Sequence, residues 1–210
     1  RKDLFETIST EEDAYWLGFI YADGYISKEG SFEISLNYND YNHLLKFADY
    51  CNFDRSKVVE KQEIGEHFRC RLSFATQGLK SNFFKVGIIP NKSLVLTYPN
   101  FLPESLQRHF IRGYFDGDGC INLRKPRTLN NTKREVTTSI LSTEEFLSKL
   151  NEKVKLPLKS ILKTDNIYRL VFSCKDARKF LKTIYNNSNI HLDRKYNKYQ
   201  NEIAPLFSNE

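Results

Sequence analysis

Hydrophobic and polar residues follow two different periods along this chain, and the order of these periods repeats. Segments with the spacing of an amphipathic helix lie at 11–22, 40–48, 79–86, 104–117, 143–150 and 177–185. Predicted strands lie at 25–26, 32–36, 57–61, 67–74, 120–123, 135–141, 159–163 and 167–172, and several of them alternate apolar and polar residues, as half-buried strands do. The pattern predicts the α+β class, with two αββαββα halves built around antiparallel sheets.

The two halves also share an internal sequence repeat. Residues 16–26 read WLGFIYADGYI and residues 111–121 read IRGYFDGDGCI, and the two segments align without gaps. Identical residues stand at Gly18/Gly113, Asp23/Asp118, Gly24/Gly119 and Ile26/Ile121. The same order of predicted helices and strands surrounds both copies, so we interpret the chain as a tandem repeat.

The one proline-rich stretch, residues 88–103, separates the two copies. Proline and glycine interrupt regular structure, so we place the linker there. The predicted domains are residues 1–100, which include the linker, and residues 101–210.

Small residues recur four positions apart in each repeated helix, as Gly18 with Ala22 and as Gly113 with Gly117. Residues at this spacing share one helical face. Glycine inside a helix lowers its stability by roughly 0.5–1 kcal/mol relative to alanine. A close approach of two helices would explain why glycine is present here. We expect these four residues to form a helix–helix interface.

Asp23 and Asp118 fall at the C-terminal ends of the two repeated helices, each before a glycine suited to the C′ position. The helix dipole and a second carboxylate both disfavour a negative charge there, and a divalent cation relieves both. One Asp-Gly after an apolar helix is more often a plain cap, but two in matched contexts favour a metal site. We predict that Asp23 and Asp118, with the adjoining Ala22 and Gly117, bind Mg²⁺ and that the two acids are catalytic.

The segments WLGFIYADG and IRGYFDGDG resemble the paired signature segments of the LAGLIDADG homing endonucleases. The resemblance extends from about Glu11 to Tyr199, and the segments GIIPNKS and LDRKYNKY resemble the tails that end each repeat in that family. Departures from the family name stand at Trp16, Tyr21, Ile111, Arg112 and Tyr114.

This resemblance implies a pseudo-symmetric monomer with a saddle of antiparallel strands on a long double-stranded DNA site. It further implies Mg²⁺-dependent cleavage that leaves 3′ overhangs, as in intron homing. It carries the family's acidic metal ligands over to Asp23 and Asp118. We expect Mn²⁺ to substitute for Mg²⁺ and Ca²⁺ to bind without cleavage.

The charge balance points toward the same kind of partner. Lys and Arg number 32 against 26 Asp and Glu, a net charge of +6 that favours a polyanion such as nucleic acid. No apolar run approaches the roughly 20 residues of a membrane span, and the first residues lack a signal-peptide pattern. We expect an intracellular protein without membrane association, in the cytoplasm of a bacterial or phage host or in an organelle.

Polar and basic side chains alternate with apolar ones along several predicted strands, as a DNA-reading sheet requires. The segment 124–134 holds several basic residues and no acid, which favours contact with the DNA backbone or a groove. The predicted DNA-binding residues are Ser27, Lys28, Glu33, Ser35, Asn37, Arg69, Arg71, Asn122, Arg124, Lys125, Arg127, Lys133, Arg134, Thr137 and Arg169.

The basic residues around the cleavage centre are less evident. Lys61 and Lys163 lie on equivalent predicted strands and are candidate catalytic residues, although each could be an ordinary solvated lysine. The alternative function is a non-cleaving nucleic-acid binder on the same fold, either an intron maturase or a transcription regulator. Intact acids in both copies favour the nuclease, because a binder has no need of paired carboxylates at helix ends.

Overall fold

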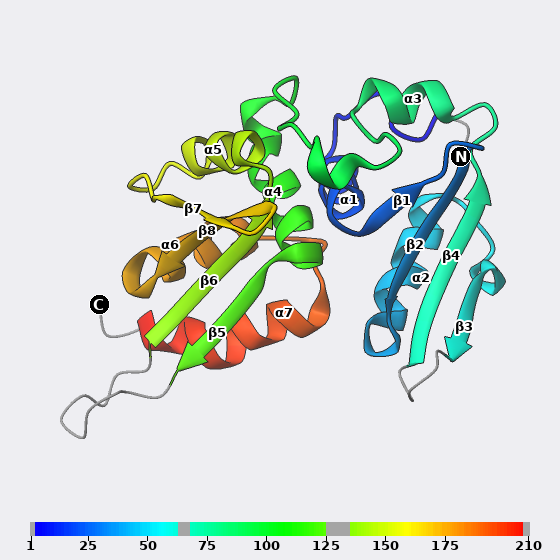
Figure 1. Cartoon of the computed structure of the whole chain (residues 1–210). Helices are drawn as coiled ribbons and strands as arrows, with labels where there is room; N and C mark the ends of the chain where they lie inside the picture. Colours follow the sequence, from blue (N-terminus) through cyan, green and yellow to red (C-terminus); the bar gives the residue numbers. More distant parts are fainter. Residues whose placement is uncertain (1–2, 63–67, 125–134, 208–210) are drawn as a thin grey trace.

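Two four-stranded antiparallel sheets flank a central pair of helices in the computed structural model (Figure 1). The structure describes residues 3–62, 68–124 and 135–207. The elements of the first half are α1 (Glu11–Asp23), β1 (Gly24–Ile26), β2 (Ser31–Asn37), α2 (Tyr41–Tyr50), β3 (Val58–Gln62), β4 (Phe68–Ala75) and α3 (Lys80–Lys85). Those of the second are α4 (Glu104–Asp118), β5 (Cys120–Arg124), β6 (Glu135–Ser142), α5 (Glu144–Lys153), β7 (Ile161–Thr164), β8 (Ile167–Ser173) and α6 (Cys174–Tyr185), followed by α7 (Asp193–Lys198).

The two sheets have the same strand order, β1-β2-β4-β3 in the first half and β5-β6-β8-β7 in the second. Every pairing is antiparallel. The predicted α+β class with two αββαββα halves is therefore confirmed. The sequence pattern did not predict α7, a short polar helix that continues into a π-helical turn at Tyr199–Ile203.

Local signals explain where the central helices begin. At α1 the Thr10 side chain accepts a hydrogen bond from the backbone N–H of Asp13, and the Asp13 carboxylate accepts one from the N–H of Thr10. This capping box satisfies two backbone N–H groups at the start of α1. Pro103 precedes α4 with its fixed φ, as expected for a helix start.

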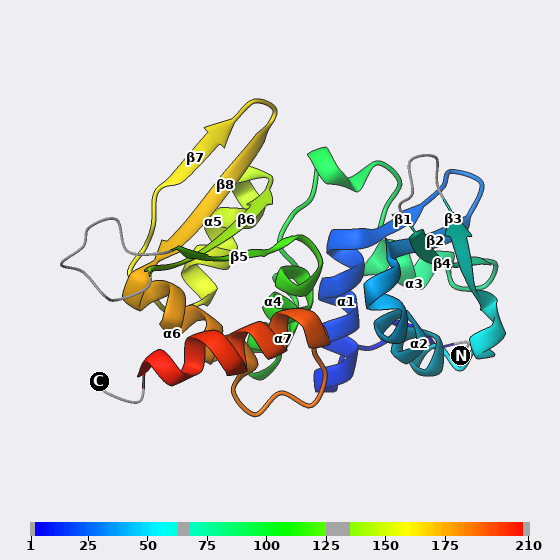
Figure 2. The same ribbon diagram turned by 90° about the horizontal axis from the view of Figure 1, so that it is seen from below.

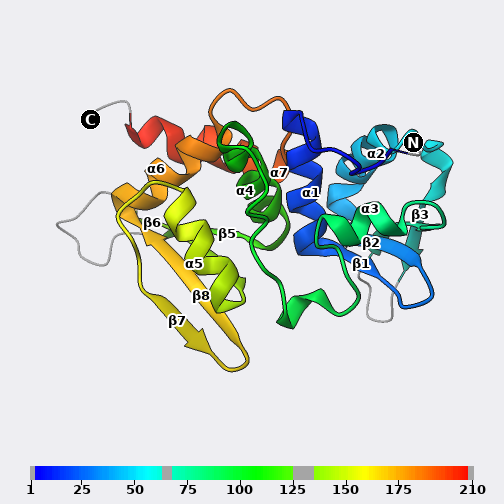
Figure 3. The same cartoon turned by 90° about the horizontal axis from the view of Figure 1, so that it is seen from above.

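Helices cover one face of each sheet and leave the other open. In the first half α2 and α3 pack on the sheet, with Phe32 of β2 against Phe47 and Phe83. In the second half α5 and α6 do the same, and the Phe172 and Phe180 rings stack at 4.9 Å. Figures 2 and 3 show α1 and α4 side by side between these two layers. No helix within the described segments is both long and apolar enough to cross a membrane.

Candidate functional site

The two halves approach each other closely at Gly18 of α1 and Gly113 of α4. A Cβ added to Gly18 would lie 2.0 Å from the Phe110 carbonyl oxygen, and one added to Gly113 would lie 1.9 Å from that of Tyr15. One helix turn further on, a Cβ at Gly117 would lie 2.4 Å from Ala22 Cβ. These backbone approaches leave no room for a side chain, which is the physical reason for the small residues in the repeat.

The same packing brings Asp23 and Asp118 together at the C-terminal ends of α1 and α4. A Cβ at Gly117 would lie 3.0 Å from Asp23 Oδ2, so this carboxylate reaches across to α4. Burial and the negative charge of Asp118 raise the pKa of Asp23 to about 7. Loss of water around the carboxyl also raises the pKa of Asp118, although the residue is partly exposed at the surface. The two carboxyl groups are thus accessible from the surface, and a positive charge bound beside them would favour their ionised form.

Gly24 and Gly119, which follow the two acids, do not have the left-handed conformation expected of a C′ glycine. Their φ values are −74° and −75°, in the extended region. A Cβ would lie 2.5 Å from Ile20 Cγ2 at the first position and 2.1 Å from Phe115 Cδ2 at the second. Each glycine does cap its helix, with the Gly24 N–H bonded to Ile20 O and the Gly119 N–H bonded to Phe115 O, but in the extended conformation in which the chain turns directly from helix into strand.

Two buried lysines lie beside the carboxylate pair. Lys92 Nζ donates to the Gly24 carbonyl, and Lys195 Nζ donates to the equivalent Gly119 carbonyl. Burial lowers the pKa of each lysine, while the charges of Asp23 and Asp118 oppose that change. Each half thus places one ammonium group next to the acids.

Sequence reasoning missed Lys92 and Lys195 as site residues, although both lie in the tails GIIPNKS and LDRKYNKY. The signal was present, because each tail has a lysine three positions after an aliphatic residue, Ile89 in the first tail and Leu192 in the second. Lys195 Nζ also donates to Phe115 O and Asp116 O, each at 2.7 Å, and so satisfies carbonyls at the end of α4.

The predicted catalytic lysines occupy other places. Lys61 of β3 pairs with Arg69, whereas Lys163 of β7 pairs with Tyr168 and is exposed. The strands are equivalent but the positions are not, because Val58 and Ile161 are the matched residues that pair with Leu72 and Leu170. A one-residue offset moves a side chain to the opposite face of a sheet. The catalytic role of these two lysines stays a prediction.

The donor set at the helix ends suits a divalent cation. Within residues 3–62, 68–124 and 135–207 no three His, Cys, Asp or Glu side chains form a metal-binding group. Any cation here would be held by Asp23 and Asp118, with remaining positions taken by carbonyl oxygens, water or substrate, which matches the preference of Mg²⁺ for few carboxylates and several waters. Of the two predicted carbonyl ligands, Gly117 O lies 3.3 Å from Lys195 Nζ and Ala22 lines the pocket beside Asp23.

The open face of the first sheet carries the predicted DNA-binding side chains of that half. Arg69 donates to Ser35 Oγ at 3.0 Å, and Arg71 forms an ion pair with Glu33 at 3.3 Å. Asn37 ends β2, and Ser27 and Lys28 lie in the turn between β1 and β2.

In the second half, the open face carries Asn122 and Arg124 on β5, Thr137 on β6 and Arg169 on β8. Lys125, Arg127, Lys133 and Arg134 lie outside the described residues. The contact of all these side chains with DNA stays a prediction.

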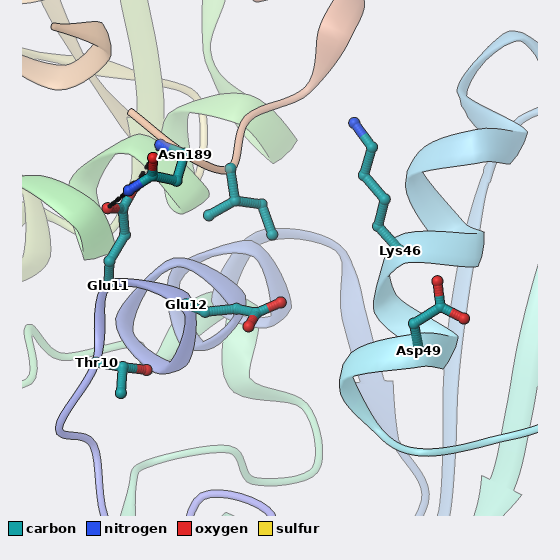
Figure 4. A pocket seen from close by; sticks show the side chains of 7 residues that line it. Thr10, Glu11, Glu12, Lys46, Asp49 and Asn189 are labelled. Atoms are coloured by element: carbon teal, nitrogen blue, oxygen red, sulfur yellow. Dashed lines mark hydrogen bonds between the residues drawn. The ribbon is translucent and has the colours of Figure 1, made fainter. Parts of the chain in front are cut away.

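The pocket in Figure 4 lies at the opposite end of α1 and is a different feature. It has a volume of about 540 Å³ between α1, α2 and the segment before α7. The Glu11 carboxylate in this pocket accepts hydrogen bonds from Asn189 at 2.9 Å and from Arg112 at 2.7 Å, and so links the first half to the second. The rise of 1.5 Å per residue places it roughly 18 Å from Asp23. A smaller pocket of about 340 Å³ is lined by Asp23 and Lys92 themselves.

Comparisons with known proteins agree with this architecture. Residues 105–185 match the family model of the LAGLIDADG-like domain. The structure is similar to the I-SmaMI LAGLIDADG homing endonuclease bound to cleaved DNA, at 15% identity and a TM-score of 0.57 over 92% of this chain and 87% of that one. It is also similar to the meganuclease I-CpaMI bound to uncleaved DNA, at 13% identity and a TM-score of 0.57 over 92% and 89%. No curated protein matches the chain. The resemblance to the LAGLIDADG homing endonuclease family is confirmed, and the fold is the one those proteins share.

Proposed function

We propose that this chain, which has the LAGLIDADG fold and a LAGLIDADG-like domain at residues 105–185, is a site-specific endonuclease that cuts both strands of a long DNA duplex. The observation that carries the proposal is the meeting of Asp23 and Asp118, from opposite halves, where the two open sheets begin. A protein that only binds DNA has no use for two neighbouring carboxylates whose pKa values are both raised by burial.

Asp23 and Asp118 would hold divalent metal, with Mg²⁺ as the proposed ion, Mn²⁺ as a substitute and Ca²⁺ as a non-supporting analogue. A bound ion of this kind supplies a water of lowered pKa and stabilises charge on the attacking and leaving oxygens. Because the two acids lie close together, the halves would share one catalytic centre, and each half would act on one strand of the DNA. A related solved structure, I-SmaMI with its DNA target, was obtained with calcium ions.

Lys92 and Lys195 bring two positive charges to the same centre. Their desolvated ammonium groups are held by the Gly24 and Gly119 carbonyls, so they need little reorganisation to stabilise a phosphate that gains charge. We assign them to transition-state stabilisation and to positioning of the scissile phosphate.

The two open sheet faces would lie on the duplex, with Arg69 and Arg71 among the groups that contact bases and phosphates. One chain supplies both halves, so the proposed active form is a monomer. The products would carry 3′ overhangs, and the enzyme would act where its target resides, in the cytoplasm of a bacterial or phage host or in an organelle.

The test is incubation of the protein with a plasmid library that carries its native flanking DNA, with Mg²⁺ or Ca²⁺. We expect linear product with Mg²⁺, retention without cutting with Ca²⁺, and 3′ extensions at the mapped ends. Asp23→Asn and Asp118→Asn should abolish cutting and keep binding, while the exposed control Asp49→Asn should cut normally. Retention without cutting in any metal would instead identify a DNA-binding protein, and no retention would refute both.

A further inference from the structure

The strand registers allow the two sheets to be compared position by position. Ile34 is opposite Gly24 and Leu72 in the first sheet. In the second sheet, Ile140 is opposite Leu170 and directly follows Ser139, which pairs with Cys120. Continuing this antiparallel register by one residue places Ile140 level with Gly119. Because Gly24 and Gly119 are equivalent in the repeat, Ile34 and Ile140 are equivalent, and both are fully buried.

From this anchor, the residues on the two open faces can be matched. Ser35 corresponds to Leu141, Arg71 to Arg169 and Val59 to Leu162, and each trio forms one row across three strands. Along the neighbouring rows, Arg69 corresponds to Ile167, Ser73 to Val171 and Glu33 to Ser139.

The comparison shows a change of chemistry between the halves. Positions that carry hydrogen-bonding groups in the first sheet carry aliphatic side chains in the second, at Leu141, Ile167 and Val171. Leu141 is 41% exposed and Leu162 is 58% exposed on this open face. Exposed aliphatic side chains in one row are unusual on a surface that is expected to bind a charged duplex. We therefore expect them to contact apolar groups of the ligand.

In the major groove the only apolar group that a base pair presents is the C5-methyl of thymine. Arg69 and Arg71, with Glu33, instead suit the hydrogen-bonding edges of guanine, adenine and cytosine. Arg169, which is kept between the two leucines of its row, supplies a phosphate or base contact within the apolar patch.

We propose that the second sheet recognises a thymine-rich half-site through methyl contacts by Leu141, Leu162, Ile167 and Val171, whereas the first sheet reads its half-site by hydrogen bonds. This inference rests on the proposed function, because it assigns the specificity of the same DNA-binding surface. The patch adjoins the carboxylate pair, since the Tyr114 hydroxyl donates to Leu141 O at 3.1 Å and interacts with Asp118. The thymines should therefore lie within the same groove that leads to the cut.

The experiment starts with selection of randomised duplexes by the wild-type protein in Ca²⁺. In a selected sequence, each thymine is then replaced by deoxyuridine, which removes only the methyl group. We expect one half-site to be enriched in thymine and to lose affinity about fourfold for each contacted methyl that is removed. Deoxyuridine in the other half-site should leave affinity within about twofold.

The double variant Leu141→Gln/Leu162→Gln assigns the methyl-sensitive half-site to the second sheet. It should lose most of the difference in affinity between the thymine and deoxyuridine duplexes, because only the contacts of Ile167 and Val171 remain. The matched control is Val59→Gln, which changes the residue equivalent to Leu162 and should keep the methyl sensitivity. All three substitutions are at exposed positions, and urea unfolding confirms that each variant is folded.

Four results would overturn the inference. Equal effects of deoxyuridine in both half-sites would remove the proposed asymmetry. An undiminished methyl effect in the double variant would assign it to other residues, and loss of the effect in Val59→Gln would place it in the first sheet. Sedimentation that shows a wild-type dimer, dispersed by the double variant, would make the patch a protein interface. Failure to select any duplex would contradict the proposed function itself.

Discussion

The Tyr15 hydroxyl donates to Asp116 Oδ2 at 2.9 Å, and this hydrogen bond joins the two halves of the chain through α1 and α4. Asp116 is fully buried and also accepts from the Tyr185 hydroxyl and from the backbone N–H of Leu192. The Tyr15 oxygen lies 3.0 Å from His43 Nε2, and since its single hydrogen is given to Asp116, His43 is the donor. The interface is therefore held by a buried hydrogen-bond network around Asp116 as well as by glycine packing.

Replacement of Tyr15 by phenylalanine should destabilise the protein. The ring is kept, but a buried carboxylate and a buried histidine each lose a partner, so we expect a loss of about 2–3 kcal/mol in the free energy of unfolding. Urea unfolding measures it. Tyr38→Phe is the control, because its bond to Glu60 lies at the exposed surface and should contribute less than about 0.5 kcal/mol. Equal effects of the two substitutions would contradict the role of the network.

Replacement of Gly18 or Gly113 by alanine should lower the free energy of unfolding by at least about 3 kcal/mol, at the upper end of overpacking penalties, because the clashing atoms belong to the backbone. Thermal unfolding of each single variant tests this. Gly78→Ala is the control that has backbone strain but no steric clash, because its φ is +82° and no atom lies within 4 Å of the added Cβ. This control should lose only about 1 kcal/mol. A Gly113→Ala protein as stable as the control would refute the close approach.

Methionine at Lys92 or Lys195 should slow DNA cleavage by about 10²-fold, because each substitution removes a preorganised charge next to the acids. Cleavage rates at saturating Mg²⁺ measure the effect. Lys195→Met should also be less stable, because it leaves buried carbonyls of α4 without a donor. The matched control is Lys163→Met on β7, which tests the sequence-based assignment directly. Unchanged rates in both buried-lysine variants, with a loss in Lys163→Met, would reverse our assignment.

His43 should make the protein less stable in mild acid. Burial lowers the pKa of His43 well below its ordinary value, so the folded chain holds the neutral ring while the unfolded chain protonates near pH 6.5. The stability linked to this histidine is fully present above about pH 6.5 and is lost as the pH falls below it. Between pH 6.5 and 5.5, the wild type should lose about 1 kcal/mol more than His43→Gln. His109 and His191 are common to both proteins, so a zero difference would contradict the assignment.

Much of this architecture follows from local sequence patterns. The hydrophobic pattern and the repeat together indicate six of the seven helices among the described residues and the strands of both sheets. Most of these elements bury one face, so their apolar residues recur at the spacing of the element. Helix α1 is buried on all sides, and its position followed from the repeat instead. The Gly18/Gly113 and Asp23/Asp118 pairs were recognisable because they stand at matched positions in a repeat. Helix α7 lacked such a signal, since it is short and its buried residue is a lysine, Lys195.

The sequence by itself determined the repeat, the α+β class and the two acids at the helix ends, because these depend on residues close together in the chain. Only the tertiary structure decided which lysines join the acids, which groups satisfy Asp116 and that Leu141 stands where Ser35 does. These relationships depend on strand register and on contacts between distant segments, and local periodicity is nearly the same for any register. Packing of complete elements selects one register, and with it the side chains that meet at the site.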